Sequence, residues 1–316
     1  MIVKMSKIAL LGIEAEREAI IDSLMEIGAV EIAEADSTEY DSVADYPSVQ
    51  AELSAVERKI ADVSSALASL NKYCPQKSGL FPSRREMTKY EFSNLLSDLD
   101  SVWSKINRIR ELEEHLVQLK NEENRLSNLC SSLLPWEKYQ VPLEITGTCK
   151  TGILAGTIPG TVDLTCVKDD LSSRAACSQI EVVNSDKDQH YVFVVYHLEM
   201  EQECLSCLKA YGFSNVSFSG LSGTVSENLK TLHNRIKEIL READRTVEQI
   251  KSHGKDKELL EAFYDSLCIE RTRIEAAGKV LETKNAFLIN GWIPSEIAEK
   301  AKEQLESKYI VSIIIS

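Results

Sequence analysis

The sequence predicts an α+β protein with two ferredoxin-like βαββαβ lobes at opposite ends of a long antiparallel helical coiled-coil rod. Three observations predict this fold: heptad-spaced apolar residues in three long stretches, a β-α-β-β-α-β pattern between the second and third stretch, and half of that pattern near each end. The chain has 316 residues, 43% of them hydrophobic, which is enough for about two domains with cores of their own.

The net charge argues against several classes of function. The chain carries 36 Lys and Arg against 50 Asp and Glu, a formal charge of −14. No basic surplus is present to displace counterions from phosphates, which argues against nucleic-acid binding and against docking on an anionic membrane. No apolar run approaches the ~20 residues that span a bilayer. The eight cysteines are spread along a Lys/Glu-rich chain and predict reduced thiols in a cytosolic setting.

The rod is predicted from apolar residues that alternate at steps of four and three, the pattern of a coiled-coil seam. Helices are expected over 49–70, 95–133 and 225–281. Pro75, Gly79 and Pro82 interrupt the first two, and Pro135 ends the second. At 1.5 Å per residue, the second helix would span roughly 60 Å and the third roughly 85 Å. Helices of that length predict a rod.

The distal lobe is predicted between the second and third helices. Its elements are expected as strand 152–159, helix 161–174, strands 177–186 and 189–197, helix 199–211 and strand 213–219. The order β-α-β-β-α-β is that of a four-stranded antiparallel sheet with two helices on one face.

The proximal lobe is predicted from the two ends of the chain together. Strand 7–13, helix 17–27 and strand 29–35 give one β-α-β half, and strand 286–294, helix 295–307 and strand 309–315 give the other. Neither half can bury its sheet face alone, so the halves are expected to combine. The rod must then fold back on itself, and helix 49–70 should pack beside 260–281.

These expectations divide the chain into three parts. The proximal lobe takes residues 1–47 and 284–316, the helical rod 48–135 and 224–283, and the distal lobe 136–223.

A search for catalytic motifs predicts a non-enzymatic chain with no cofactor and no small-molecule substrate. The nearest phosphate-loop lookalike, residues 147–151, has Cys149 where a second glycine is needed, and its side chain would block close approach to phosphate. The five histidines form no metal-binding or triad motif.

Cys204 and Cys207 form the one CxxC motif. A redox CxxC uses a helix N-terminus to lower its thiol pKa, whereas this one is expected within a helix beside Glu201 and Glu203. A zinc site would need two further ligands at matched spacing. The two cysteines are interpreted as core residues. A metal-binding or redox role is the less favoured alternative.

His253, Gly254 and Lys257 interrupt the apolar seam of the third helix. A glycine inside a helix costs ~1 kcal/mol relative to alanine. Two readings stay open: a solvated stretch where the partner helix slips phase, or a compliant point in the rod.

Four stretches carry a resemblance to the cytoplasmic half of subunit I (subunit a) of the V-type/A-type ATPases. They are residues 4–12 (KMSKIALLG), 16–32 (EREAIIDSLMEIGAVEI), 221–224 (LSGT) and 287–294 (FLINGWIP). Within the last, Gly291, Trp292 and Pro294 match the family's F-x-x-x-G-W-[VI]-P pattern. Trp292 is expected as an apolar plug on the sheet, and Pro294 opens the next helix with Ser295 as its cap.

The resemblance implies a stator component on the cytoplasmic face of a membrane. The proximal lobe would lie near the membrane and the distal lobe near the catalytic sector. The lobes would receive peripheral stalks of E and G subunits, with a central-stalk subunit of the C/d type as a further partner. The family's membrane half, absent here, would carry the ion pathway, so ion transport belongs to the complete complex.

Two rival classes remain. A coiled-coil scaffold resembling the chromosome-maintenance proteins would need nucleotide-binding heads, which the lobes lack. A metal-binding ferredoxin-like module would bind zinc or copper at Cys204 and Cys207.

Overall fold

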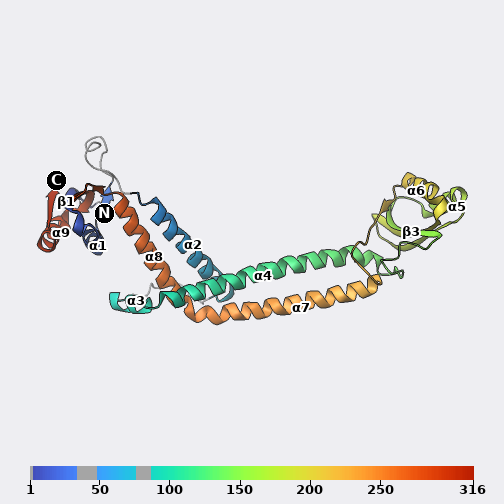
Figure 1. The fold of residues 1–316 in the computed structure, drawn as a ribbon, viewed down its shortest axis with the longest axis horizontal. Coiled ribbons are helices and arrows are strands. Elements are labelled where there is room, and N and C mark those ends of the chain that lie inside the picture. Colours follow the sequence, from blue (N-terminus) through green and yellow to red (C-terminus); the bar gives the residue numbers. More distant parts are fainter. Residues whose placement is uncertain (1–2, 34–47, 76–86) are drawn as a thin grey trace. The chain divides into compact units, whose positions relative to one another are not determined.

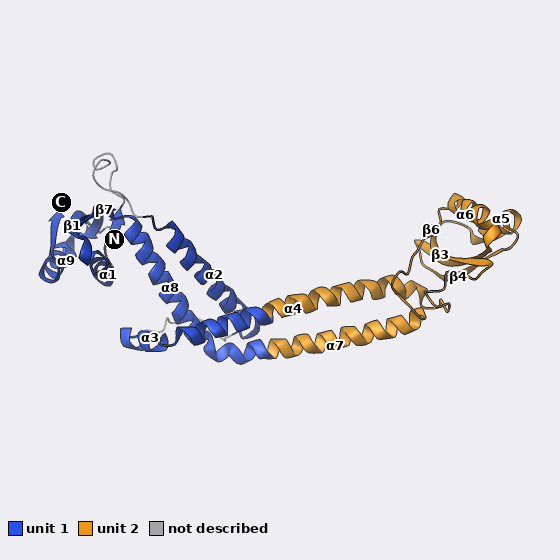
Figure 2. Cartoon of the chain, viewed as in Figure 1, with its two compact units in different colours: residues 1–112, 249–316 blue, residues 113–248 orange. Residues whose placement is uncertain are grey.

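The computed structural model describes residues 3–33, 48–75 and 87–316 (Figure 1). It is a mixed α+β chain with long helices and two antiparallel sheets. The predicted break at Pro75, Gly79 and Pro82 falls largely outside the described residues. Residue contacts divide the chain into unit 1, residues 1–112 and 249–316, and unit 2, residues 113–248 (Figure 2).

Unit 1 contains the sheet that the two ends of the chain were expected to build together. Its strands run in the order β2-β8-β1-β9, and every neighbouring pair is antiparallel. The expectation that the N-terminal and C-terminal halves share one sheet is therefore confirmed. The strands are β1 (Met5–Ile13), β2 (Glu31–Ala33), β7 (Leu281–Glu282), which pairs with β8, β8 (Ala286–Pro294) and β9 (Val311–Ile315).

Two helices cover one face of this sheet, α1 (Arg17–Ile27) and α9 (Ser295–Lys308). Leu10, Phe287 and Ile289 of the sheet pack against Ile20 and Leu24 of α1 in a core from which water is excluded. Burying such side chains contributes about 1.5–3 kcal/mol each.

Four further helices complete unit 1 or enter it: α2 (Gln50–Tyr73), α3 (Lys89–Leu95), α8 (Lys257–Gly278) and the first part of α4 (Leu99–Leu133). Helix α2 packs along α8, as expected for the segments 49–70 and 260–281.

The second predicted helix does not begin at Leu95. Helix α3 ends there, and α4 starts at Leu99 after Asp98, whose Oδ1 accepts a hydrogen bond from the backbone N–H of Ser101 at 3.0 Å. Thr88 and Glu91 form a capping box at the start of α3. Local capping groups set these ends, and they outweigh the apolar spacing that runs through the gap.

The prediction of one continuous helix over 225–281 is also wrong. Helix α7 (Val225–Ser252) ends in a short 3₁₀ segment, His253–Asp256, and α8 begins at Lys257. Gly254 lowers helix propensity at that point, and the 3₁₀ turn tightens the chain between the two helices. Leu281, expected in the same helix, belongs to strand β7.

Unit 2 contains the second sheet, with strand order β4-β5-β3-β6 and antiparallel neighbours throughout. Helices α5 and α6 pack on one face through Ile158, Val194 and Leu208. The elements are β3 (Thr151–Pro159), α5 (Leu164–Arg174), β4 (Ser178–Ser185), β5 (Gln189–His197), α6 (Glu201–Ala210) and β6 (Ser214–Asn215).

Strand β6 is much shorter than the strand predicted over 213–219. Val216 and Phe218 leave the edge and pack over the second face of the sheet, with Leu133 at the end of α4 and Val225 at the start of α7. Burial of these apolar side chains outweighs extension of an edge strand.

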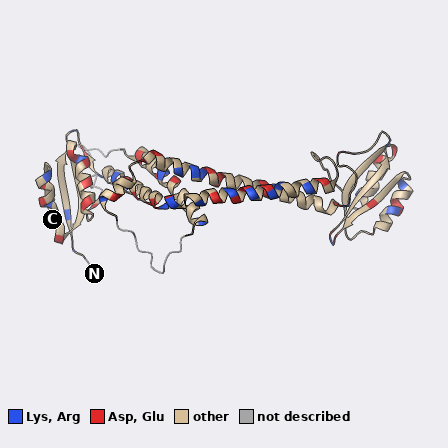
Figure 3. Ribbon diagram, turned by 90° about the horizontal axis from the view of Figure 1, so that it is seen from below, with Lys and Arg blue, Asp and Glu red and all other residues tan. Residues whose placement is uncertain are grey.

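Within unit 2, α4 and α7 run antiparallel. Leu119 and Leu126 of α4 pack against Ile239 of α7, and His115 Nε2 lies 3.0 Å from Glu242 Oε1. Acidic and basic residues are interspersed along the long helices (Figure 3). Ion pairs one turn apart, such as Arg125 with Glu122 at 2.8 Å and Arg235 with Glu238 at 3.1 Å, lie on exposed surfaces and contribute little each.

Candidate functional site

The junction between α7 and α8 places His253 in a cluster with two residues that sequence reasoning missed. Asp256 is only 9% exposed although it is acidic. Its Oδ1 lies 3.0 Å from Lys105 Nζ on α4, and its Oδ2 lies 3.2 Å from His253 Nδ1. The carboxylate therefore ties the 3₁₀ turn to α4 within unit 1.

Two opposing effects act on this carboxyl. Burial acts to raise the pKa of Asp256, but hydrogen bonds from Lys105 and His253 outweigh it and leave the pKa lowered. Asp256 is thus held in its charged form. Asp256 directly precedes α8, but its side chain makes no capping hydrogen bond to that helix.

Gly254 and Lys257 lie in the same junction but make different contacts. A Cβ added at Gly254 would lie 3.2 Å from the Sγ of Cys74, at the end of α2. Lys257 Nζ lies 3.8 Å from Glu261 Oε1, one turn further along α8. The structure brings His253 into the Asp256 cluster, and it places Gly254 against α2.

Gly291 of β8 lies opposite Ile32 of β2. A Cβ added there would lie 2.5 Å from the backbone oxygen of Glu31, closer than real Cβ contacts. Only glycine fits this approach without a backbone shift.

The expected roles of Trp292 and Ser295 are wrong. Phe287, Ile289, Gly291 and Ile293 alternate toward the helices, so the strand period of two turns Trp292 to the opposite face, where it is 42% exposed. It is not a buried plug. Helix α9 follows Pro294 without a side-chain cap, and the Ser295 hydroxyl instead lies 2.8 Å from that of Ser6 on β1.

Cys204 and Cys207 lie in the core of unit 2, with at most 1% of either residue exposed. Burial raises the pKa of the Cys204 thiol to about 11, with a smaller contribution from Cys207. Burial, and not Glu201 or Glu203, is the cause of the raised pKa. Among the described residues, no group of three or more His, Cys, Asp or Glu is arranged to hold a metal ion.

Unit 2 also has an open cleft of about 750 Å³ beside β3, lined by residues 143–148 and 215–221. Glu144 is the one charged side chain among its lining residues in the described chain, and its Oε2 accepts a hydrogen bond from the backbone N–H of Gly223 at 2.7 Å. The remaining polar groups are hydroxyls, an amide and backbone, which supply no acid–base pair.

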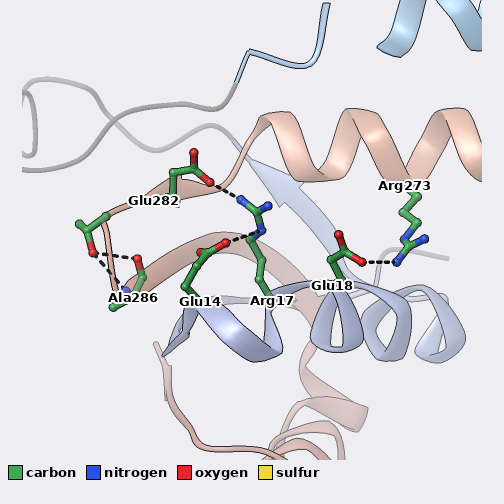
Figure 4. Close-up of polar contacts among 7 residues, drawn as sticks. Glu14, Arg17, Glu18, Arg273, Glu282 and Ala286 are labelled. Atoms are coloured by element: carbon green, nitrogen blue, oxygen red, sulfur yellow. Dashed lines mark hydrogen bonds and ion pairs between the residues drawn. The ribbon is translucent and has the colours of Figure 1, made fainter.

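Salt bridges join α8 and strand β7 to helix α1 in unit 1 (Figure 4). Arg17 of α1 pairs with Glu282 of β7 and, at 3.2 Å, with Glu14. Arg273 of α8 contacts Glu18 at 3.4 Å and Asp22 at 2.9 Å on α1. These contacts hold α8 and the strand that follows it against α1.

Two comparisons with known proteins find counterparts of this chain, one by sequence and one by structure. No family model matches the chain. An A-type ATP synthase subunit I from Methanocaldococcus jannaschii is 26% identical over 329 aligned positions, which cover 96% of this chain. The chain is a homologue of A-type ATP synthase subunit I.

The homologue spans about half the length of that relative, since the alignment covers 47% of it. A crystal structure of the cytoplasmic N-terminal domain of subunit I, a homolog of subunit a of V-ATPase, matches with a TM-score of 0.50. The match covers 98% of this chain and 100% of that domain at 17% identity, and it concerns the fold. Among the described helices, none is long and apolar enough to cross a membrane.

Proposed function

We propose that this chain is the cytoplasmic part of a stator subunit in a rotary A/V-type ATPase. The observation that carries the proposal is the alignment with A-type ATP synthase subunit I along 96% of the chain. The role is non-catalytic: the chain links peripheral stalks to the membrane sector and resists the torque of the rotor. Ion transport belongs to the complete complex, in which the other half of subunit I contributes the membrane segments.

Each proposed domain has its own part in this function. Residues 1–47 and 284–316 form the proximal lobe, 136–223 the distal lobe, and 48–135 with 224–283 the helical rod. Both sheets have the strand order 2-3-1-4 when their strands are numbered along each lobe, which supports a ferredoxin-like fold for each.

The proposed partners are the E and G stalk subunits, bound through the lobes, and a central-stalk subunit of the C/d type. Packed helices suit this role, because torque is resisted by many apolar contacts such as Leu126 with Ile239 and not by one site. The His253, Gly254 and Lys257 junction is the proposed point of flexing.

A binding experiment tests the proposal. The full chain, immobilised on beads, should retain a folded E–G heterodimer from the same complex, and beads without the chain should not. Failure of the two folded proteins to associate at micromolar concentrations would contradict the stator assignment.

A further inference from the structure

The cleft of unit 2 lies beside an interruption in the hydrogen bonding of β3. On the edge of β3 that faces away from β5, two short segments bond to the strand, one that precedes it in the chain and one that includes β6. The backbone N–H of Ile153 donates to the Thr146 oxygen at 2.8 Å, and the N–H of Val216 donates to the Ala155 oxygen at 2.8 Å. All four residues line the cleft.

The reciprocal hydrogen bonds are not made. A regular antiparallel ladder would also join the Thr146 N–H to the Ile153 oxygen and the Ala155 N–H to the Val216 oxygen. Neither bond is formed in the part of the chain that the structure describes. The Ile153 oxygen and the Ala155 N–H point to the same edge as the bonded groups of their own residues. Ala155 is only 8% exposed, and a backbone donor in such a position needs an acceptor.

One residue of an extended peptide can satisfy both groups at once. The Ile153 oxygen and the Ala155 N–H belong to the residues on either side of Leu154. In parallel strands, a residue donates its N–H to the residue before its neighbour and accepts from the residue after it. An antiparallel residue would instead need both groups of one residue, and the N–H of Ile153 and the oxygen of Ala155 are already occupied. The pattern that is left therefore fits a parallel peptide.

The walls of the cleft fit an aliphatic segment without acidic residues. Ile145 and Leu198 line the cleft and are 42% and 44% exposed, so apolar side chains of a peptide can cover them. Glu144, the one charged side chain among the described lining residues, would repel an acidic peptide. The volume of about 750 Å³ lies within the range of sites that enclose a ligand.

We propose that this cleft binds a short extended peptide segment of a partner protein, whose backbone forms a parallel bridge to Ile153 and Ala155. The main-chain hydrogen bonds provide affinity and direction, and Ile145 and Leu198 select aliphatic side chains. The site is a peptide-recognition site in addition to the proposed stator function, and it does not depend on that function.

The test is a titration of the full isotope-labelled chain with a capped pentapeptide of alternating valine and threonine, followed by NMR of the backbone amides. The Ala155 amide signal should move downfield, because its N–H gains an acceptor. The control peptide carries an N-methyl group on its central valine, which removes the N–H that would reach the Ile153 oxygen. It should bind about tenfold more weakly.

Ser217→Trp tests where the peptide lies. Ser217 is exposed and lines the cleft, so an indole at this position would fill the space that the peptide needs. Binding should weaken about tenfold or more. Ser173→Trp is the matched control, because it places the same side chain at an exposed position of α5, which packs on the other face of the sheet. It should change the affinity less than about twofold, and thermal unfolding checks that both variants are folded.

Several results would overturn the inference. An Ala155 signal that does not move up to about 5 mM peptide would show that the cleft takes no extended segment. Equal binding of the methylated peptide would show that the backbone bridge is not formed. Signal movement with the concentration of the chain alone, abolished by Ser217→Trp, would assign the cleft to a second copy of the chain. These measurements do not involve the E–G heterodimer, so the stator proposal is tested separately.

Discussion

Asp256 is the residue on which the α7–α8 junction depends most. It is buried, it is charged, and its two oxygens contact Lys105 on α4 and His253 in the 3₁₀ turn. A buried carboxylate with two partners is costly to disrupt, because an amide in its place keeps one acceptor oxygen but turns the other into a donor and removes the charge that Lys105 faces.

Asp256→Asn should therefore destabilise unit 1 by about 1–3 kcal/mol. Urea unfolding followed by the fluorescence of Trp103, whose ring lies 5.3 Å from that of Phe263 on α8, would report on this region. Asp244→Asn on the exposed surface of α7 is the control and should change stability by less than about 0.5 kcal/mol. Equal effects of the two substitutions would show that the cluster contributes nothing special.

The same carboxyl group is expected to make the stability of the folded chain depend on pH. Its pKa is lowered in the folded chain, so its stabilising contribution is present above the unfolded value of about 3.9 and is lost as the pH falls through the folded pKa. The stability difference between the unaltered chain and Asp256→Asn should be fully present at about pH 5 and shrink below about pH 4. A difference that stays constant down to pH 3 would contradict the lowered pKa.

Because Cys204 and Cys207 are buried, we expect alkylation to be selective for the exposed cysteines. At pH 8, a thiol of pKa about 11, as for Cys204, is ionised in about one molecule in a thousand, and its burial excludes the reagent. Iodoacetamide followed by mass spectrometry should modify exposed Cys149, Cys166 and Cys177 long before Cys204 or Cys207. Early modification of Cys204 would contradict this expectation. Stoichiometric zinc binding that protects Cys204 would favour a metal site at Cys204 and Cys207.

At the scale of elements, helix ends were the least predictable feature. Apolar spacing correctly located α2 and the ends of α4 and α7 next to the distal lobe, because burial of a stripe sets where a helix packs. It missed the start of α4, which the Asp98 side chain caps, and the break between α7 and α8 at the 3₁₀ segment His253–Asp256. A heptad pattern continues through both positions, so only the Asp98 cap and the glycine at position 254 mark the breaks.

Gly254→Ala tests the proposed flexibility of the junction. Alanine favours helix by ~1 kcal/mol over glycine, and its Cβ would meet Cys74 Sγ at 3.2 Å, a contact that the flexible thiol can relieve. Hydrogen exchange across residues 250–258 should slow in this variant and stay unchanged in Lys255→Ala, an exposed neighbour. Unchanged hydrogen exchange in Gly254→Ala would contradict the proposal that the junction flexes.

The apolar alternation along β8 indicates which face of the sheet each of its side chains occupies. The alternation of Phe287, Ile289 and Ile293 already places Trp292 on the opposite face, yet its size suggested a buried plug. The lysine and glutamate beside it, Lys7 and Glu31, come from other strands, so their proximity appears only once the register is known.

At the scale of the molecule, the incomplete halves at the two ends were the strongest signal. A β-α-β half leaves a sheet face open, and β1 with β2 finds its complement in β8 and β9, more than 250 residues further along. Long-range pairing of this kind was predictable because no other segment could supply the missing strands. What could not be predicted is the surface that partners use, since an exposed residue leaves no periodic trace.

Electron cryomicroscopy of the assembled rotary ATPase containing this chain, classified by rotational state, tests the stator assignment most directly. The chain is expected to contact the peripheral stalks and to keep one position relative to them while the rotor takes up different angles. A chain that turns with the rotor, or that makes no contact with any stalk, would contradict this expectation.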